Sequence, residues 1–504
     1  MKNAFLFFKK NKKDILFIII LVFLTYRAWQ MLPQFTIRSD GFASMLSYNQ
    51  KAFWGGPYPL ASIVLSEMIL GAILPKIFGV NLSYYYWLEI FVIIVIAVEF
   101  YLAVKVVTKN HLVSFSAALM SAVSYFGVYD MVSTHCYCFF LERVFPVIFL
   151  IPSFLFLHLF LEKRIKKYLI VSLLLYFLGV GLGHFTLLIF PAFFLYPLFW
   201  KFFNEKTLRK KIEGFVYGFL YVILTGFFYG IQQINESGIS PHNWTFFEFL
   251  FHPEKYLYFK KIALQFVYWS QYPFFLWDLL KDLARNPFSL VIDHRLAGSY
   301  IPLVIIIYVL AALIIYKFLP KQRTMLFTIV FGVPMIFYMN AYIGQYDMLN
   351  FSGASRYLYY PTFLLAIFWS YFLWAVFWRK KNIWVLSGFL VLALYYVINV
   401  SLINGNAILT IEWNKVTRKI FDHVISTREK VLPNTLIIVT YPEFGSQEAS
   451  FFTDQIGKGK VRYMSDNNLV NAPYTWENVS SSSAHVIKLR YNKNCSCIRE
   501  EKIK

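Results

Sequence analysis

Long apolar runs alternate with short polar segments along most of this chain. A helix needs about 20 mostly apolar residues to cross the ~30 Å hydrocarbon core of a bilayer. Runs of roughly that length occur at 15–33, 84–104, 113–129, 139–161, 168–183, 185–200, 214–232, 299–316, 324–342, 357–378 and 383–403. The pattern predicts an all-α polytopic membrane protein with about 11 transmembrane helices, of which the fifth and sixth are separable only at Gly181–His184.

A twelfth apolar run, 59–79, differs from the others because polar residues interrupt it. It follows the sequence Gly-Gly-Pro-Tyr-Pro at 55–59, and its polar residues are Ser62, Ser66, Glu67 and Lys76. These features favour a helix that lies at the membrane–water interface over one that spans the bilayer.

The chain after residue 403 has a different pattern. Apolar residues recur at helical spacing over 411–430, Leu436–Val439 is typical of a strand, and Val486–Tyr491 is a second strand candidate. We therefore expect a transmembrane domain at 1–403, with long outer loops at 34–83 and 233–298, and a small α/β unit at 404–504. The aromatic loop 233–298 either caps a cavity at the outer face or lies on the lipid headgroups.

Composition agrees with a membrane protein. Of the 504 residues, 58% are hydrophobic and 15% are charged, and the mean hydropathy is +0.54. A soluble domain carries about 25% charged residues. The composition thus excludes a disordered protein, a collagen, a small disulfide scaffold and an ordinary cytosolic enzyme.

Basic residues are concentrated in alternate connections between the runs. The segments 1–14, 105–112, 162–168, 201–213, 317–323 and 379–382 hold 22 of the 48 Lys and Arg residues in 53 positions. The loops 34–58, 129–138 and 341–355 hold only Arg38 and Lys51. By the positive-inside rule, the N-terminus is cytoplasmic and the C-terminal tail lies outside the cytoplasmic membrane. This distribution explains the net charge of +21 without a nucleic-acid partner.

All four cysteines fall outside the cytoplasm in this topology, as the pairs Cys136-x-Cys138 and Cys495-x-Cys497. An oxidising exterior permits disulfides that would tie the tail to the 129–138 loop. Free thiols and a zinc site that includes His135 are the alternatives, although C-x-C is weak spacing for a metal.

Several ionisable residues lie at the outer ends of the predicted spans, where charge is costly. On the predicted topology they share one level of the membrane and could line one cavity: Asp40, Asp130, Glu142, Arg143, His184, Asp347 and Arg356. Structural explanations are a helix cap for Asp40, buried ion pairs for Glu142 and Arg143, a turn for His184, headgroup contact for Arg356, and solvated loops for Asp130 and Asp347. Their joint placement at one face favours a functional role.

Such a set of side chains suits the transfer of a sugar from a lipid phosphate. A carboxylate can act as general base on an acceptor hydroxyl. Arginines hold phosphate through charge-assisted hydrogen bonds, and Arg143 is a candidate to bind the donor phosphate. One carboxylate that acts through the acceptor leads to inversion at the anomeric carbon. The acceptor is a glycan, a lipid or a protein.

Three sequence features resemble the GT-C superfamily of polytopic membrane glycosyltransferases, which includes protein O-mannosyltransferases and lipid A aminoarabinose transferases. They are Ser39-Asp40-Gly41, the 55–59 turn with the helix that ends at Ile77-Phe78-Gly79-Val80, and Ser355-Arg356-Tyr357-Leu358-Tyr359-Tyr360-Pro361. The resemblance covers residues 10–403. It implies a polyprenyl- or dolichyl-phosphate-linked sugar donor, Asp40 as the catalytic base and Arg356 as a donor-phosphate ligand.

The sequence departs from relatives with adjacent paired acids, because Gly41 follows Asp40. A divalent metal shared by Asp40 and Asp130 is an open possibility, and no cofactor is fixed. The function expected is that of a hexosyl- or pentosyltransferase in cell-envelope glycosylation. A transporter or flippase of lipid-linked sugar, and a ligase or polymerase of surface polysaccharide, are the alternatives.

Overall fold

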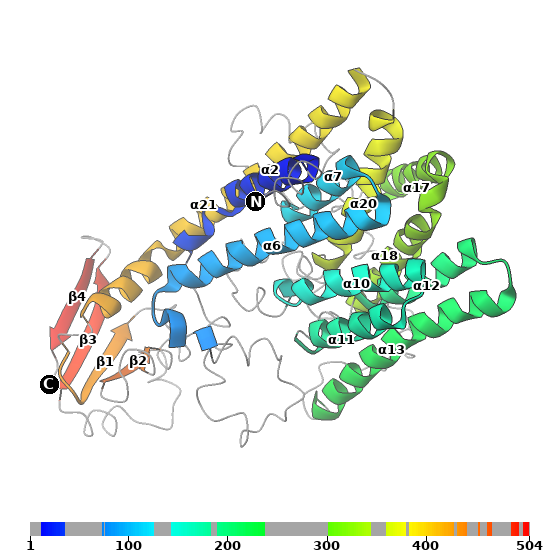
Figure 1. Cartoon of the computed structure of the whole chain (residues 1–504). Helices are drawn as coiled ribbons and strands as arrows, with labels where there is room; N and C mark the ends of the chain where they lie inside the picture. The colour runs from blue at the N-terminus through cyan, green and yellow to red at the C-terminus, as the bar shows by residue number, and fades with distance from the viewer. Residues whose placement is uncertain are drawn as a thin grey trace, which may run out of the picture. The chain divides into compact units, whose positions relative to one another are not determined.

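The computed structural model describes residues 12–35, 73–74, 76–124, 143–182, 189–236, 301–343, 359–379, 383–427, 431–440, 452–453, 461–465, 485–492 and 497–502. Within these residues the protein is mostly helical, with one small sheet (Figure 1). The helices up to residue 236 are α2 (Lys12–Trp29), η1 (Leu32–Gln34), α6 (Leu82–Thr108), α7 (His111–Ala122), α10 (Val147–Lys163), α11 (Lys166–Leu182), α12 (Phe190–Asn204) and α13 (Leu208–Glu236). The later ones are α17 (Ile301–Phe318), η5 (Pro320–Gln322), α18 (Arg323–Ile343), α20 (Tyr359–Leu373), the π-helical turn η7 (Trp374–Trp378) and α21 (Ile383–Thr427).

Each predicted run overlaps a helix in this set. Five stretches of the described residues are long and apolar enough to cross a membrane: Lys12–Gln34, Leu82–Thr108, Leu208–Phe228, Tyr359–Trp378 and Ile383–Glu412. The protein is therefore an integral membrane protein, whereas the total of about 11 spans stays a prediction. The interfacial helix predicted at 59–79 and the loop 233–298 lie almost wholly outside the described residues.

Helices α2, α6 and α7 are joined at one end by a buried carboxylate. Asp14 of α2 accepts hydrogen bonds from the Tyr101 hydroxyl at 2.5 Å and from His111 Nδ1 at 2.7 Å, and it also pairs with Lys105. Tyr101 and Lys105 lie near the end of α6, and His111 begins α7. The start of α2, the end of α6 and the start of α7 therefore lie at the same level.

Helices α10 to α13 are held together by small residues and buried hydroxyls. Ser153 of α10 and Ser172 of α11 each donate to the other's backbone carbonyl, at 2.8 and 2.7 Å. A Cβ on Gly218 of α13 would lie 2.5 Å from the Phe194 carbonyl oxygen of α12, so only glycine permits this close approach. Small residues at helix contacts and interhelical hydrogen bonds are the usual means of helix association in a membrane, where burial of apolar surface adds little.

Four of the segments predicted to be cytoplasmic are linked to one another by ion pairs. Lys105 pairs with Asp14, Lys109 with Glu162 at 3.0 Å, and Arg164 with Glu205. The two remaining segments are also linked: Arg379 donates to the Phe318 carbonyl at 3.5 Å. The first four basic segments thus lie close together, and so do the last two. This is expected if every second connection between the helices lies on the same side of the membrane.

The chain divides into two compact units by its internal contacts. One comprises 1–30, 90–133 and 142–406, and the other comprises 31–89, 134–141 and 407–504. The second unit therefore contains the segment 34–83, predicted to be the first outer loop, as well as the C-terminal tail. The domain boundary expected at residue 403 stays a prediction.

The second unit contains a four-stranded sheet with the order β2-β1-β3-β4. Its strands are β1 (Thr435–Thr440), β2 (Val461–Ser465), β3 (His485–Asn492) and β4 (Cys497–Lys502), and β1 is parallel to both β2 and β3. Leu436, Ile438 and Val486 form a buried apolar cluster. The strand candidates 436–439 and 486–491 fall within β1 and β3, and β2 and β4 were not expected.

Helix α21 is longer than expected. The sequence suggests a span at 383–403 and a separate helix at 411–430, but α21 continues through Asn404-Gly405-Asn406 to Thr427. A glycine within a helix costs about 1 kcal/mol relative to alanine. Leu402 and Ile403, which precede this site, and Ala407, which follows it, are almost fully buried. Their burial outweighs that cost.

Candidate functional site

Arg143 is the predicted site residue that the structure describes. It lies four residues before α10 and is 2% exposed. The Tyr360 hydroxyl, in the first turn of α20, donates a hydrogen bond of 3.2 Å to the Arg143 backbone carbonyl. A permanent cation in a buried position attracts anions strongly, because the local dielectric constant is low.

This hydrogen bond joins two segments that the sequence separates widely. Tyr360 belongs to the Ser355–Pro361 motif, and Tyr359, Tyr360 and Pro361 form the buried first turn of α20. Proline is well tolerated there, because the first backbone N–H groups of a helix have no intrahelical partner. The structure thus brings the end of this motif to Arg143. Arg356 itself lies three residues before the helix and outside the described residues.

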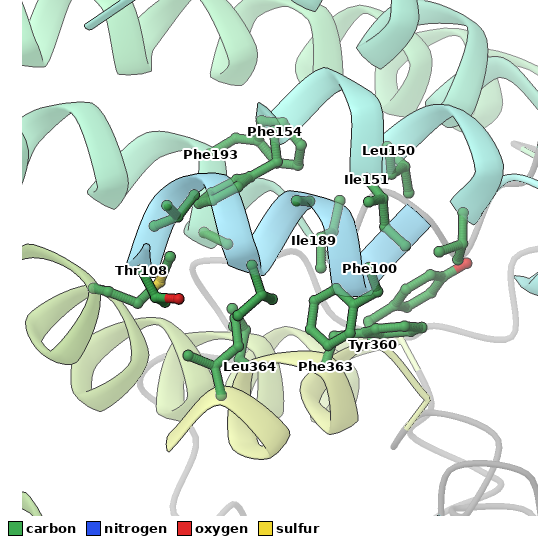
Figure 2. A pocket seen from close by; sticks show the side chains of 17 residues that line it. Phe100, Thr108, Leu150, Ile151, Phe154, Ile189, Phe193, Tyr360, Phe363 and Leu364 are labelled. Atoms are coloured by element: carbon green, nitrogen blue, oxygen red, sulfur yellow. The ribbon is translucent and has the colours of Figure 1, made fainter. Parts of the chain in front are cut away.

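An apolar cavity of about 70 Å³ lies beside Tyr360, between α6, α10, α12, α18 and α20. Figure 2 shows the ring of Phe100 close to Phe363 and Tyr360, with Leu150 and Ile151 nearby. Among the described side chains that line it, only Tyr360 and Thr108 carry oxygen atoms, and their hydroxyls lie at opposite ends of the view (Figure 2). A cavity of about 150 Å³ lined by similar side chains stays dry and binds benzene; this one is about half that volume, and its lining favours apolar groups.

A buried carboxylate at the start of α6 was missed by the sequence analysis. Glu89 is 3% exposed, although it lies in the second turn of a largely apolar helix. The charges of Glu89 and Arg418 both act on the nearby Tyr86 hydroxyl. An acid within an apolar run is the signal that identifies such a residue, because ionisable side chains in spans are rare and are usually functional.

The remaining predicted site residues lie outside the part of the chain that the structure describes. They are Asp40, Asp130, Glu142, His184, Asp347 and Arg356. Cys136, Cys138 and Cys495 also lie outside it, and Cys497 is described only as the first residue of β4, so the disulfides stay predictions. Among the described residues no group of three or more His, Cys, Asp or Glu side chains could hold a metal ion.

No protein-family model and no curated protein matches this chain. Solved structures of an oligosaccharyltransferase from Archaeoglobus fulgidus are similar to it. The apo form is 12% identical, over 94% of this chain and 69% of its own, with a TM-score of 0.42. The same organism's AglB, in complex with an inhibitory peptide and a dolichol-phosphate, is 12% identical, over 96% of this chain and 70% of its own, with a TM-score of 0.44.

Both neighbours are GT-C membrane glycosyltransferases. They belong to the superfamily that the sequence motifs resemble. At 12% identity and these TM-scores, the likeness carries no inference about the activity of this chain.

Proposed function

We propose that this protein is a GT-C-like membrane glycosyltransferase that transfers a sugar from a polyprenyl-phosphate donor to an acceptor at the outer face of the membrane. The observation that carries the proposal is the hydrogen bond between Tyr360 and the Arg143 carbonyl. It brings a buried cation to the late-span motif that contains Arg356, and an apolar cavity adjoins the same tyrosine. A lipid phosphate requires a cation for its phosphate group and an apolar wall for its hydrocarbon tail.

In the proposed reaction Asp40 removes the proton from an acceptor hydroxyl, and the resulting oxygen attacks the anomeric carbon of the donor sugar. A new glycosidic bond forms while the bond between that carbon and the phosphate oxygen breaks. The electron pair of the broken bond stays on the lipid phosphate, where Arg356 and Arg143 stabilise the negative charge. A single displacement inverts the anomeric configuration.

The apolar cavity provides part of the wall against which the donor's hydrocarbon tail packs. Phe100, Phe363 and Leu364 contribute to its lining, and Tyr360 connects it to the backbone at Arg143. The tail would remain in the bilayer while the phosphate reaches the outer ends of α10 and α20. We further propose the eleven-span arrangement with an exterior α/β tail, which places this chemistry outside the cytoplasm.

The test is transfer by purified protein in vesicles supplied with polyprenyl-phosphate sugars. We expect wild-type protein to form a product whose anomeric configuration is opposite to that of the donor. Asp40→Asn should lower kcat by about 10²–10⁴-fold, the usual contribution of a general base. Arg356→Gln should mainly raise the KM for the donor.

Glu412→Gln is the matched control, because Glu412 is an exposed acid that pairs only locally with Lys415 at 3.5 Å among the described residues. It should transfer sugar as wild type does. Full transfer by Asp40→Asn would remove Asp40 as the base. Movement of intact lipid-linked sugar across the membrane, with no transfer by wild type from any donor, would favour a flippase instead.

A further inference from the structure

Arg418 of α21 lies at the point where the first outer loop begins. Its guanidinium group donates to the Phe35 backbone carbonyl at 3.1 Å and to the Ser83 hydroxyl oxygen at 3.3 Å. Phe35 follows η1, directly after the first span, and Ser83 is in the first turn of α6. One side chain from the C-terminal part of the chain therefore joins the two ends of the first outer loop.

The segment that Arg418 contacts is itself held by further hydrogen bonds. The Ser83 hydroxyl donates to the Pro33 carbonyl at 3.1 Å, and the Phe35 amide donates to the Leu32 carbonyl at 2.8 Å. Phe35 is fully buried, and its ring meets that of Tyr86 edge-on, with centroids 5.8 Å apart. The Arg418 guanidinium, about 30% exposed, thus makes part-buried contacts to a segment whose own backbone and side chains are packed.

The face of α21 that carries Arg418 is polar and covered. Thr410, Asn414 and Thr417, which lie on the same side of the helix at helical spacing, are each at most 1% exposed. Both amide atoms of Asn414 are buried with no hydrogen-bond partner among the described residues.

We infer that Arg418 is a positioning residue for the proposed transfer reaction. It anchors the start of the first outer loop at Phe35, five positions before Asp40 in the sequence. The inference rests on the proposed function, and it gives the C-terminal extension of α21 a role in catalysis without a contact to the substrate. A displacement of about 1 Å in a reacting group can lower a rate by about 10²-fold, so an anchor near the base has leverage on kcat.

Arginine suits this role better than lysine. Its planar guanidinium group presents several N–H donors in fixed directions, and here two different nitrogens reach Phe35 and Ser83. A lysine ammonium presents its three donors from one nitrogen on a flexible stem, so it does not hold two separate acceptors in fixed directions as a guanidinium does. Arg418→Lys should therefore restore only part of the anchoring.

The experiment compares Arg418→Gln and Arg418→Lys with two controls on the same helix. Asp422→Asn removes the exposed pair between Arg418 and Asp422, at 3.3 Å, and leaves the contacts to Phe35 and Ser83. Lys415→Gln removes an exposed cation one turn away. For each protein, kcat and the donor KM are measured in vesicles, and hydrogen exchange is followed at the amides of Leu32, Gln34 and Phe35.

We expect Arg418→Gln to lower kcat at least tenfold with an unchanged donor KM, and to speed exchange at the Phe35 amide. Arg418→Lys should lie between Arg418→Gln and wild type, and both controls should match wild type. An unchanged kcat in Arg418→Gln, while wild type transfers sugar, would overturn the inference alone. So would unchanged exchange at Phe35, or a rise in donor KM with kcat unaffected. If wild type transfers no sugar from any donor, the proposed function fails and this inference with it.

Discussion

At the scale of single residues, the Tyr360 hydroxyl has an effect that a contact between side chains would not have. It donates a hydrogen bond of 3.2 Å to the backbone carbonyl of Arg143. This bond holds the backbone of Arg143 in place, and with it the point from which the guanidinium side chain extends. In Tyr360→Phe the buried carbonyl loses this donor, which costs about 1–3 kcal/mol. If Arg143 holds donor phosphate, the KM for the donor should rise severalfold while kcat changes less. Steady-state kinetics over a range of donor concentrations would measure this.

Tyr395→Phe is the matched control for that change. The Tyr395 hydroxyl also donates to a buried backbone carbonyl at 3.2 Å, but to that of Met120 in α7 and not to that of Arg143. Both variants should lose similar thermal stability, but only Tyr360→Phe should weaken donor binding. Equal donor KM values in the two variants would mean that Tyr360 supports the fold alone.

Residue-scale chemistry is also where the sequence is least informative. Hydropathy indicates that Arg143 lies at a span end, but its neighbour Tyr360 is 217 positions away and follows only from packing. Arg418 has no distinguishing pattern, since it is one of several basic residues on an amphipathic helix. Glu89, by contrast, could have been identified from its apolar surroundings in the run 84–104. The residue pattern along the sequence reveals an unfavourable local placement, such as an acid in an apolar run. It does not reveal which distant residues the fold brings together.

At the scale of elements, Asp14 connects α2, α6 and α7 through Tyr101, Lys105 and His111. Asp14→Asn removes the charge that attracts these three donors and places an amide N–H₂ group among them. A hydrogen bond to a charged group is worth about 1.5–3 kcal/mol, so we expect a loss of at least that size. The apparent melting temperature of the protein in detergent should fall by several degrees.

A matched control for Asp14 is available at the neighbouring connection. Lys109 and Glu162 form an ion pair at 3.0 Å whose side chains are 75% and 40% exposed. Exposed pairs contribute about 0–1 kcal/mol, so Lys109→Gln should melt close to wild type. A wild-type melting temperature for Asp14→Asn would mean that the three helices are held by their apolar contacts alone.

The helices themselves were largely predictable because each apolar run is limited by charged or turn-forming residues. The strand at Leu436–Val439 was predictable for a similar reason, since it is a continuous β-branched and aliphatic run. Strand β4 was not, because Cys497–Lys502 is rich in charge and pairs at the edge of the sheet. The continuation of α21 past Gly405 was missed because the cost of the local breaker is outweighed by burial of the residues on either side of it, which the hydropathy pattern alone does not show.

At the scale of the whole molecule, the ion pairs of the first unit group the basic segments but do not say which side of the membrane they face. The positive-inside rule predicts the cytoplasmic side. We therefore expect Lys206→Cys, in the exposed connection between α12 and α13, to be protected from a membrane-impermeant maleimide in right-side-out vesicles. Glu501→Cys, on exposed β4, should be labelled at once.

Both changes are made in a background with the four native cysteines replaced by serine, checked for wild-type melting. Permeabilisation should expose Lys206→Cys, and the opposite labelling order would put the arginines of the proposed site on the cytoplasmic side, where a donor presented at the outer leaflet could not reach them.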